Sequence, residues 1–302
     1  MVARHADTEI VRRFNRSYTQ RIGALEESFL GLGLPLAAAR LLFEIGAEAT
    51  TVHTLRARLG LDSGYLSRLL RQLEAGRLVV VAADPDDGRR RSVRLTAAGR
   101  AAWRKLDARS EKLAHQLVEP LTERQRHRLT EALATADLLV RAATVRLEVV
   151  DPASPMARAA LGHYYAELDR RFSGGFDAGQ ATADDAPAMR APRGAFVVAT
   201  SDGEPVACGG MQTLAPGVAE LKRMWVHEAW RGAGLGSRML RRLEQAAVER
   251  GLPVVRLDTN SALTEAIAMY QRAGYRAIER YNDNPYARHW FEKDLAATGA
   301  GA

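Results

Sequence analysis

A glycine-rich turn in the C-terminal half is the segment whose residue types most clearly predict chemistry. It reads Arg-Gly-Ala-Gly-Leu-Gly from Arg231 to Gly236, follows the apolar run 219–226 and opens the segment 237–250, which has apolar residues at helical spacing. Amides in such a turn lie at a helix N-terminus, where unpaired N–H donors and the helix dipole attract anions. Glycine lets the backbone approach phosphate oxygens closely, and Arg231 adds a positive charge. The turn therefore predicts a pyrophosphate-binding site.

Two other glycine-rich phosphate motifs do not match this turn. A dinucleotide fingerprint that starts at Gly232 needs a third glycine at position 237, which is Ser237. A P-loop needs Gly-Lys-Ser/Thr, which is absent. Arg-x-x-Gly-x-Gly after a strand instead resembles the acetyl-CoA motif of the GNAT family (Gcn5-related N-acetyltransferases).

A second segment supports the same resemblance. Leu257 to Asn260 ends a predicted strand, and the helix that follows ends in Tyr270-Gln-Arg-Ala-Gly274-Tyr275. This arrangement resembles the family's Asn and Ala-x-x-x-Tyr-x-x-x-Gly-Phe/Tyr segment, in which the tyrosine lies near the sulfur of CoA. The resemblance covers residues 156–293 and implies a mixed sheet in which two neighbouring strands splay, so that pantetheine pairs with an exposed strand edge.

The resemblance implies acetyl-CoA as co-substrate, with no metal. The residues expected to bind it are Met224, Trp225, Val226, Arg231, Gly232, Ala233, Gly234, Leu235, Gly236, Ser237, Asn260 and Tyr270.

Acetyl transfer to an amine needs a deprotonated amine, a stabilised oxyanion and a proton for the departing thiolate. Tyr270 is the expected acid towards the sulfur. Glu220, on the strand that precedes the turn, is either the base, acting directly or through water, or an ordinary strand glutamate. Thr264 and Glu265 stand where the commonest GNAT pattern has an asparagine, which affects hydrogen bonding on the substrate side. The residues proposed to line the acceptor pocket are Arg171, Phe172, Phe176, Asp177, Lys222, Arg223, Arg288 and His289.

The N-terminal half carries the basic excess of the chain. Residues 1–150 hold 25 Lys and Arg against 18 Asp and Glu, a difference of 7, which equals the net charge of the whole chain, +7. Residues 51–60 form a short predicted helix that ends at glycine, and residues 62–76 form another with Leu66, Leu69, Leu70 and Leu73 on its inner face. This pattern predicts a helix-turn-helix whose second helix meets the major groove of DNA.

The next residues predict a wing. Strands at 78–81 and 92–95 flank an Asp-Pro-Asp-Asp-Gly turn and the basic tip 89–91, and Thr96 caps a long helix. With Asp87, Gly88 and Arg89 in the wing and Leu95-Thr96-x-x-Gly99 after it, residues 8–147 resemble the MarR family of winged-helix regulators. The resemblance implies a homodimer, built from the first helix and the last helix at 121–147, that binds a pseudo-palindromic DNA duplex. The residues expected to contact DNA are Ser63, Tyr65, Ser67, Arg68, Arg71, Arg89, Arg90 and Arg91.

Prolines in Asp151-Pro-Ala-Ser-Pro155 mark a boundary between two predicted domains. Residues 1–150 are expected to form an all-α winged helix-turn-helix with a small β wing, and residues 151–302 an α/β GNAT fold with a mixed, splayed sheet. The chain lacks an apolar leader and a membrane-length apolar run, which predicts a cytoplasmic protein, and Cys208 is expected in a buried strand.

The predicted function is a transcriptional regulator that also acetylates a small amine. Two alternatives remain open: a GNAT domain that only senses acetyl-CoA or an effector, and acetylation of a protein lysine.

Overall fold

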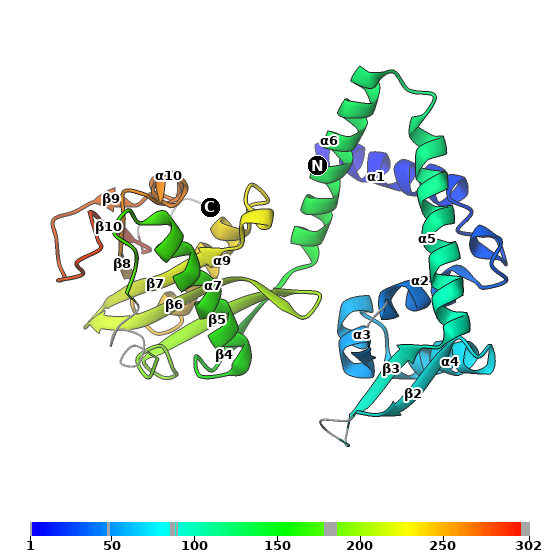
Figure 1. The fold of residues 1–302 in the computed structure, drawn as a ribbon. Helices are drawn as coiled ribbons and strands as arrows, with labels where there is room; N and C mark the ends of the chain where they lie inside the picture. Colours follow the sequence, from blue (N-terminus) through cyan, green and yellow to red (C-terminus); the bar gives the residue numbers. More distant parts are fainter. Residues whose placement is uncertain (1, 47–48, 85–87, 89, 178–185, 297–302) are drawn as a thin grey trace. The chain divides into compact units, whose positions relative to one another are not determined.

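The computed structural model describes residues 2–46, 49–84, 88, 90–177 and 186–296 (Figure 1). The chain forms two compact units, Met1–Glu131 and Ala132–Ala302. The border between them falls inside helix α6 (Glu123–Thr144).

The helices of the N-terminal unit are α1 (Val2–Arg21), α2 (Leu36–Ile45), α3 (Val52–Leu59), α4 (Ser63–Ala75) and α5 (Ala97–Val118). Gly60, which is left-handed with φ 61°, is the C-cap of α3. Asp62 is the N-cap of α4, and its carboxylate accepts a hydrogen bond from the Tyr65 amide at 2.9 Å. The four leucines expected on the inner face of α4 are all buried. The helix-turn-helix is therefore confirmed.

The wing is also present, as an antiparallel pair of strands. β2 (Val79–Ala83) pairs with β3 (Arg91–Leu95), and the two-residue strand β1 (Thr50–Thr51), which the sequence analysis did not include, joins β3 on its other side. The Thr96 hydroxyl caps α5 by accepting from the Gly99 amide at 2.9 Å. A Cβ on Gly99 would lie 1.9 Å from the Leu78 carbonyl oxygen, so only glycine fits there.

The C-terminal unit is built on a seven-stranded sheet with the order β4-β5-β6-β7-β8-β10-β9. The strands are β4 (Arg146–Val150), β5 (Gly194–Ser201), β6 (Glu204–Ala215), β7 (Val218–Val226), β8 (Val254–Thr259), β9 (Arg276–Ala277) and β10 (His289–Asp294). The expected hairpin at Asp202-Gly203 joins β5 to β6. Only β7 and β8 are parallel neighbours, so the sheet is mixed as expected.

The splay lies between these two parallel strands. Their ladder covers only Val218–Leu221 of β7 and Val254–Leu257 of β8, after which the strands continue unpaired with each other. Helix α7 (Pro155–Arg171) packs on one face of the sheet through Phe196 and Val198, and α9 (Leu235–Val248) packs on the other through Val197. Helix α10 (Thr264–Arg272) follows β8 (Figure 1).

Residues 145–150 differ from the sequence-based expectation. The helix expected over 121–147 ends at Thr144, and residues 146–150 form β4, which pairs with β5 from Arg146↔Thr200 to Val150↔Phe196. The alternation Val145, Leu147, Val149 has the period of a strand, but it directly continues a helical pattern and is hidden by it. The edge strand of the C-terminal sheet therefore precedes the proline-rich segment 151–155.

Candidate functional site

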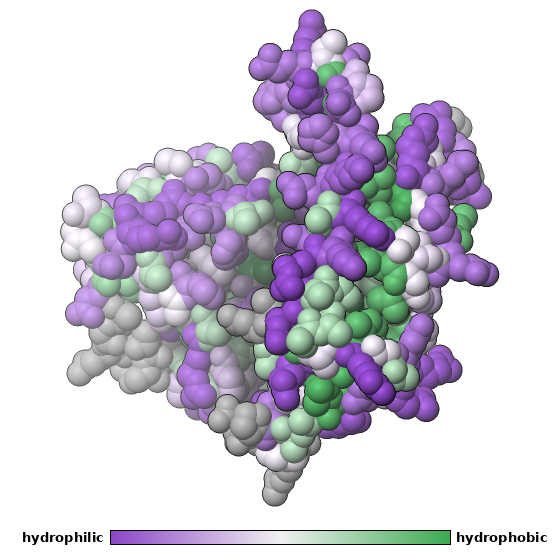
Figure 2. All heavy atoms as spheres, turned by 45° about the vertical axis from the view of Figure 1, so that its right-hand side comes forward, coloured by the Kyte–Doolittle hydropathy of each residue, from purple (hydrophilic) through white to green (hydrophobic). Residues whose placement is uncertain are grey.

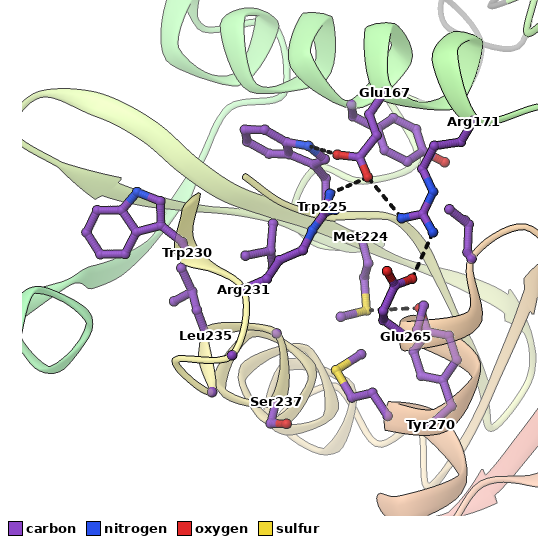
Figure 3. A pocket seen from close by; sticks show the side chains of 18 of the residues that line it. Glu167, Arg171, Met224, Trp225, Trp230, Arg231, Leu235, Ser237, Glu265 and Tyr270 are labelled. Carbon is purple, nitrogen blue, oxygen red and sulfur yellow. Dashed lines mark hydrogen bonds and ion pairs between the residues drawn. The ribbon is translucent and has the colours of Figure 1, made fainter. Parts of the chain in front are cut away.

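A cavity of about 360 Å³ lies where β7 turns away from β8 (Figure 3). Its walls come from α7, the end of β7, the glycine-rich turn and α10. The lining residues are Tyr164, Glu167, Leu168, Arg171, Met224, Trp225, Val226, Trp230, Arg231, Gly232, Gly234, Leu235, Gly236, Ser237, Leu263, Glu265, Ala266, Met269, Tyr270 and Arg272. The structure thus brings together ten of the twelve residues expected to bind acetyl-CoA.

The glycine-rich turn has the conformation that its sequence requires. Gly232 (φ 81°) and Gly234 (φ 76°) are left-handed, and Gly234 is the N-cap of α9. The helical hydrogen bonds of α9 start with the Arg238 amide, which donates to the Gly234 carbonyl. The amides before Arg238 in the first turn therefore have no acceptor within the helix. A Cβ on Gly236 would lie 3.1 Å from Met269 Sδ, which shows how closely α10 packs on the turn.

A β-bulge shapes the end of β7. Cys208 pairs with Trp225 and Gly210 pairs with Lys222, so Arg223 and Met224 stand opposite Gly209 alone. Arg223 is left-handed (φ 56°), buried at 8% exposure, and donates to the Tyr165 hydroxyl. The bulge reorients the strand just before Met224, Trp225 and Val226, which line the cavity.

Glu167 of α7 is the central charged group of the cavity and was not expected from the sequence. The residue is 6% exposed, and its carboxylate accepts hydrogen bonds from Trp225 Nε1 (2.9 Å), Arg171 Nη1 (3.3 Å) and Arg231 Nη2 (Figure 3). Three separate elements therefore meet at one buried anion. The Arg231 side chain, expected to face phosphate, is bound to Glu167.

Arg171 connects Glu167 to α10. Its Nη2 donates to Glu265 Oε2 at 2.8 Å and to the Ala262 carbonyl at 2.7 Å. The Arg171 guanidinium holds the pKa of the Glu265 carboxyl below its usual range. Arg171 was expected on the acceptor side, and the structure places it in the wall of the cavity between α7 and α10.

Tyr270 lies at the inner end of the cavity, 5% exposed, with its hydroxyl 3.8 Å from Met224 Sδ (Figure 3). Burial raises its pKa, and the nearby Asp258 charge raises it further. Its phenol is therefore protonated at neutral pH, as a proton donor must be.

Glu220 lies outside the cavity lining, in a polar cluster on the adjoining part of the sheet. Its Oε1 accepts from Tyr281 Oη at 3.0 Å and from Asn282 Nδ2 at 3.2 Å. Its Oε2 accepts from Gln212 Nε2 at 2.8 Å and lies 3.5 Å from Lys222 Nζ. The structure thus places Lys222, expected on the acceptor side, beside the expected base.

Aromatic side chains from two distant segments meet near this cluster. Phe176 lies 4.8 Å from Tyr286, 5.8 Å from Tyr165 and 5.9 Å from Phe172, measured between ring centroids. The Asp177 amide donates to the Tyr286 hydroxyl at 3.1 Å. Phe172, Phe176 and Asp177, expected at the acceptor pocket, are therefore adjacent to one another.

Four expected residues take other positions. Ala233 and Asn260 do not appear in the cavity lining, and Asn260 instead donates to the Tyr286 carbonyl at 2.6 Å. Arg288 is exposed and donates to the carbonyls of Pro285 and Ala287, while His289 Nε2 lies 3.1 Å from Ser261 Oγ.

The sequence carried only a weak signal for the lining residues it did not predict. Glu167 has the i,i+4 spacing to Arg171 of an ordinary helix-surface ion pair, and nothing local shows that Trp225 and Arg231 contact Glu167. Met269 directly precedes the motif residue Tyr270, so its place in the cavity lining could have been predicted from the sequence. Cys208, expected in a buried strand, is fully buried there, and burial raises the pKa of its thiol.

The expected DNA-contacting residues of α4 lie on its outer face. Ser63, Ser67, Arg68 and Arg71 are exposed and Tyr65 is partly buried, with the Arg68 guanidinium 5.6 Å from the Tyr65 ring centroid. Arg90 and Arg91 are exposed at the wing, whereas Asp87 and Arg89 lie outside the described residues.

Apolar residues also reach the surface of the N-terminal unit (Figure 2). Ile10, Val11, Phe14 and Tyr18 on α1 are 43–57% exposed. In the C-terminal unit, Leu139 (50%) and Val140 (64%) of α6 are also exposed. No helix in the described part of the chain is long and apolar enough to cross a membrane. Within the same residues, no group of three or more His, Cys, Asp or Glu is arranged to hold a metal ion.

Two family models match the chain. Residues 162–275 match the acetyltransferase (GNAT) family and residues 32–90 match the MarR family. The chain is 33% identical over 110 residues to an IAA acetyltransferase of Azospirillum brasilense, a match that spans 36% of this chain and 72% of that protein.

A second relative and a solved structure are also similar to this chain. An uncharacterized N-acetyltransferase of Schizosaccharomyces pombe is 30% identical over 96 residues, which span 31% of this chain and 59% of that protein. A GNAT-family acetyltransferase structure from Staphylococcus aureus Mu50 covers 50% of this chain and 99% of its own, with 16% identity and a TM-score of 0.43.

Proposed function

The chain belongs to the GNAT family of acetyltransferases and carries a MarR-family region ahead of that domain, and we propose that it transfers the acetyl group of acetyl-CoA to the nitrogen of a small amine. The observation that carries this proposal is the cavity at the splay. Its lining, which encloses about 360 Å³, joins the N-terminus of α9, the segment of β7 that does not pair with β8, and a buried phenol.

Each part of the cavity has a role in the proposed reaction. The first-turn amides of α9, from Gly234 to Ser237, bind the pyrophosphate of acetyl-CoA. The main chain of Met224–Val226 pairs with the pantetheine and polarises the thioester carbonyl. The acceptor amine loses a proton to the acidic cluster that contains Glu220, its nitrogen bonds to the carbonyl carbon, the C–S bond breaks, and Tyr270 protonates the thiolate.

The preference for a small acceptor rests on the aromatic contact between residues 172–177 and Tyr286. Phe172 and Phe176 pack on Tyr286 with ring centroids 5.8 Å and 4.8 Å apart, and we infer that these rings restrict how an acceptor approaches the cluster. A free amine can reach past these rings more easily than a lysine on a folded protein surface.

A turnover screen with a CoA-thiol readout tests the proposal. The full chain is incubated with acetyl-CoA and amino acids, polyamines, aromatic amines or amine antibiotics, with a lysine peptide as the protein-substrate arm. We expect transfer to at least one small amine and none to the peptide. Acetyl-CoA binding by calorimetry without any turnover would instead favour the sensor interpretation.

We also propose that the N-terminal unit binds duplex DNA as a homodimer. The exposed face of α4 with Arg68 and Arg71 supports major-groove binding, and the exposed apolar stripe of α1 supports a partner surface. Phe14→Glu is the matched test because Phe14 is 47% exposed, so the charge is tolerated in a monomer and costly in a dimer interface. We expect this variant to be monomeric by light scattering and to lose affinity for a duplex selected with the parent chain. A dimeric variant with parental affinity would reject α1 as the interface.

A further inference from the structure

Two carboxylates, Glu220 on β7 and Asp258 on β8, lie on the same face of the sheet and share one amide donor. Glu220 is in register with Arg256, and Asp258 lies two residues further, so both side chains leave the sheet on the same side. Asn282, in the loop between β9 and β10, donates through Nδ2 to Glu220 Oε1 at 3.2 Å and to Asp258 Oδ2 at 2.5 Å. One side chain therefore connects the two acids.

The orientation of the Asn282 amide is fixed by a neighbour. Trp290 Nε1 lies 2.9 Å from Asn282 Oδ1, and an indole N–H can only donate. Asn282 must therefore turn its oxygen to Trp290 and its NH₂ group to the carboxylates. Both amide hydrogens are then used, one on each acid.

Glu220 is poorly placed to accept a proton from a substrate. It is 3% exposed, and it receives Tyr281, Asn282 and Gln212 as donors with the Lys222 ammonium close by. Both carboxylate oxygens of Glu220 are therefore already held by side chains of the fold. Glu220 also lies in the part of the sheet where β7 and β8 are still paired.

Asp258 is better placed than Glu220 to accept a proton from a substrate. It comes directly after Leu257, the last residue of β8 that pairs with β7, and it is only partly buried. Its recorded hydrogen bonds come from the neutral amides of Asn282 and Asn284. Partial burial raises the pKa of Asp258, the Glu220 charge adds to this rise, and the two amides and Lys222 oppose it. The Asp258 charge acts on Tyr270 across the splay.

We propose that Asp258 takes the proton from the acceptor amine, and that Glu220 is a positioning residue that holds Asp258 in place through Asn282. This inference rests on the proposed acetyl transfer. The N–H proton moves to an Asp258 oxygen as the nitrogen–carbon bond forms, the C–S bond breaks, and the thiolate takes the Tyr270 proton. Asp258 later releases its proton to water, and Tyr270 regains a proton from water. The charged or titratable groups around Asp258 are Glu220, Lys222, Tyr270 and Tyr281.

The test compares Asp258→Asn and Glu220→Gln in the full chain, with the amine that the parent acetylates fastest. Asp283→Asn is the matched control. It removes a carboxylate from the loop that carries Asn282, and the Asp283 side chain is fully exposed and, among the described residues, paired only with Arg280. Turnover is measured from about pH 5 to 9, and acetyl-CoA binding is measured by calorimetry.

We expect Asp258→Asn to bind acetyl-CoA like the parent and to lose about 10²- to 10⁴-fold in kcat at pH 7, with partial recovery as pH rises. Glu220→Gln should retain turnover. The acid limb of its kcat profile should move to lower pH, because removing the Glu220 charge lowers the pKa of Asp258. Asp283→Asn should match the parent.

Two results would overturn this inference and leave the proposed function standing. One is an active Asp258→Asn enzyme with the parental pH profile, and the other is a Glu220→Gln enzyme whose kcat profile has its acid limb at the parental pH. A parent chain that acetylates no amine would overturn the proposed function, and the inference with it.

Discussion

Replacing Gly234 by aspartate should remove acetyl-CoA binding, whereas asparagine at the same position should preserve most of it. Gly234 is left-handed (φ 76°), and a Cβ there would meet no atom within 4 Å. Aspartate and asparagine have almost the same volume and tolerate this backbone region better than other side chains. The strain is therefore common to both variants, and the difference between them is one negative charge at the N-terminus of α9.

The size of that difference follows from Coulomb's law. At an effective dielectric constant of about 20, two unit charges about 5 Å apart repel by about 3 kcal/mol. Each 1.4 kcal/mol changes an equilibrium constant about tenfold, so aspartate should weaken binding more than 100-fold relative to asparagine. Since salt screens exposed charges, the gap should narrow at high ionic strength.

Calorimetric titration of both variants with acetyl-CoA, at low and at high salt, measures this gap directly. DNA affinity, followed in parallel by fluorescence anisotropy, should be the same in both variants because the substitution lies outside the N-terminal unit. Equal acetyl-CoA affinities for the aspartate and asparagine variants would refute the assignment of the pyrophosphate to this turn.

Three further predictions concern other parts of the chain. Tyr270→Phe should bind acetyl-CoA normally and lower kcat about 10²- to 10⁴-fold, because it deletes the proton donor and keeps the ring packing; parental turnover would reject the acid role. Arg68→Ala should weaken binding to a selected duplex by about 1–3 kcal/mol in anisotropy titrations, and unchanged affinity would remove α4 from the DNA face. Arg276 and Arg256 hold the pKa of Glu292 below its usual range, so its stabilisation is present above about pH 4.3 and disappears as pH falls through the lowered value. In urea unfolding, Glu292→Gln should thus cost about 1 kcal/mol at pH 7 and progressively less as pH falls below about 4.3.

Sequence patterns were sufficient for the features that depend on local chemistry. The glycines at 232 and 234 allow a sharp turn, the four α4 leucines have helical spacing, and Asp202-Gly203 is a hairpin signal. The structure has the turn with both glycines at positive φ, the buried leucines and the hairpin. The cavity lining also agrees with the motif, since the turn and Tyr270 border one space.

The features that the sequence did not predict depend on long-range contacts. Glu167 is 64 residues from Arg231 and 58 from Trp225, and no local pattern states that the fold brings them together. Asn282 connects Glu220 and Asp258 over 62 and 24 residues in the same way. Strand β4 was hidden because its alternation directly follows a helical period.

The end of α6 shows how the glycine-rich turn itself is held. Arg238, in the first turn of α9, donates from Nη2 to the Val145 carbonyl at 2.9 Å and from Nη1 to the Ala142 carbonyl, and so satisfies carbonyls at the C-terminus of α6. The Arg141 guanidinium lies 4.5 Å from the ring centroid of Trp230, which borders the cavity. The start of α9 is thus anchored to the end of α6, within the C-terminal unit.

Arg238→Met tests this anchor, because methionine keeps much of the apolar stem and removes the donors. Buried carbonyls left without donors cost about 1–3 kcal/mol, so the unfolding transition of the C-terminal unit should move to lower temperature. Acetyl-CoA affinity should fall as well, since the amides that bind pyrophosphate start the same helix. Arg241→Met, on the exposed side of α9, is the matched control and should change neither property. If the two variants melt alike and bind acetyl-CoA alike, the contact between α6 and α9 does not support the site.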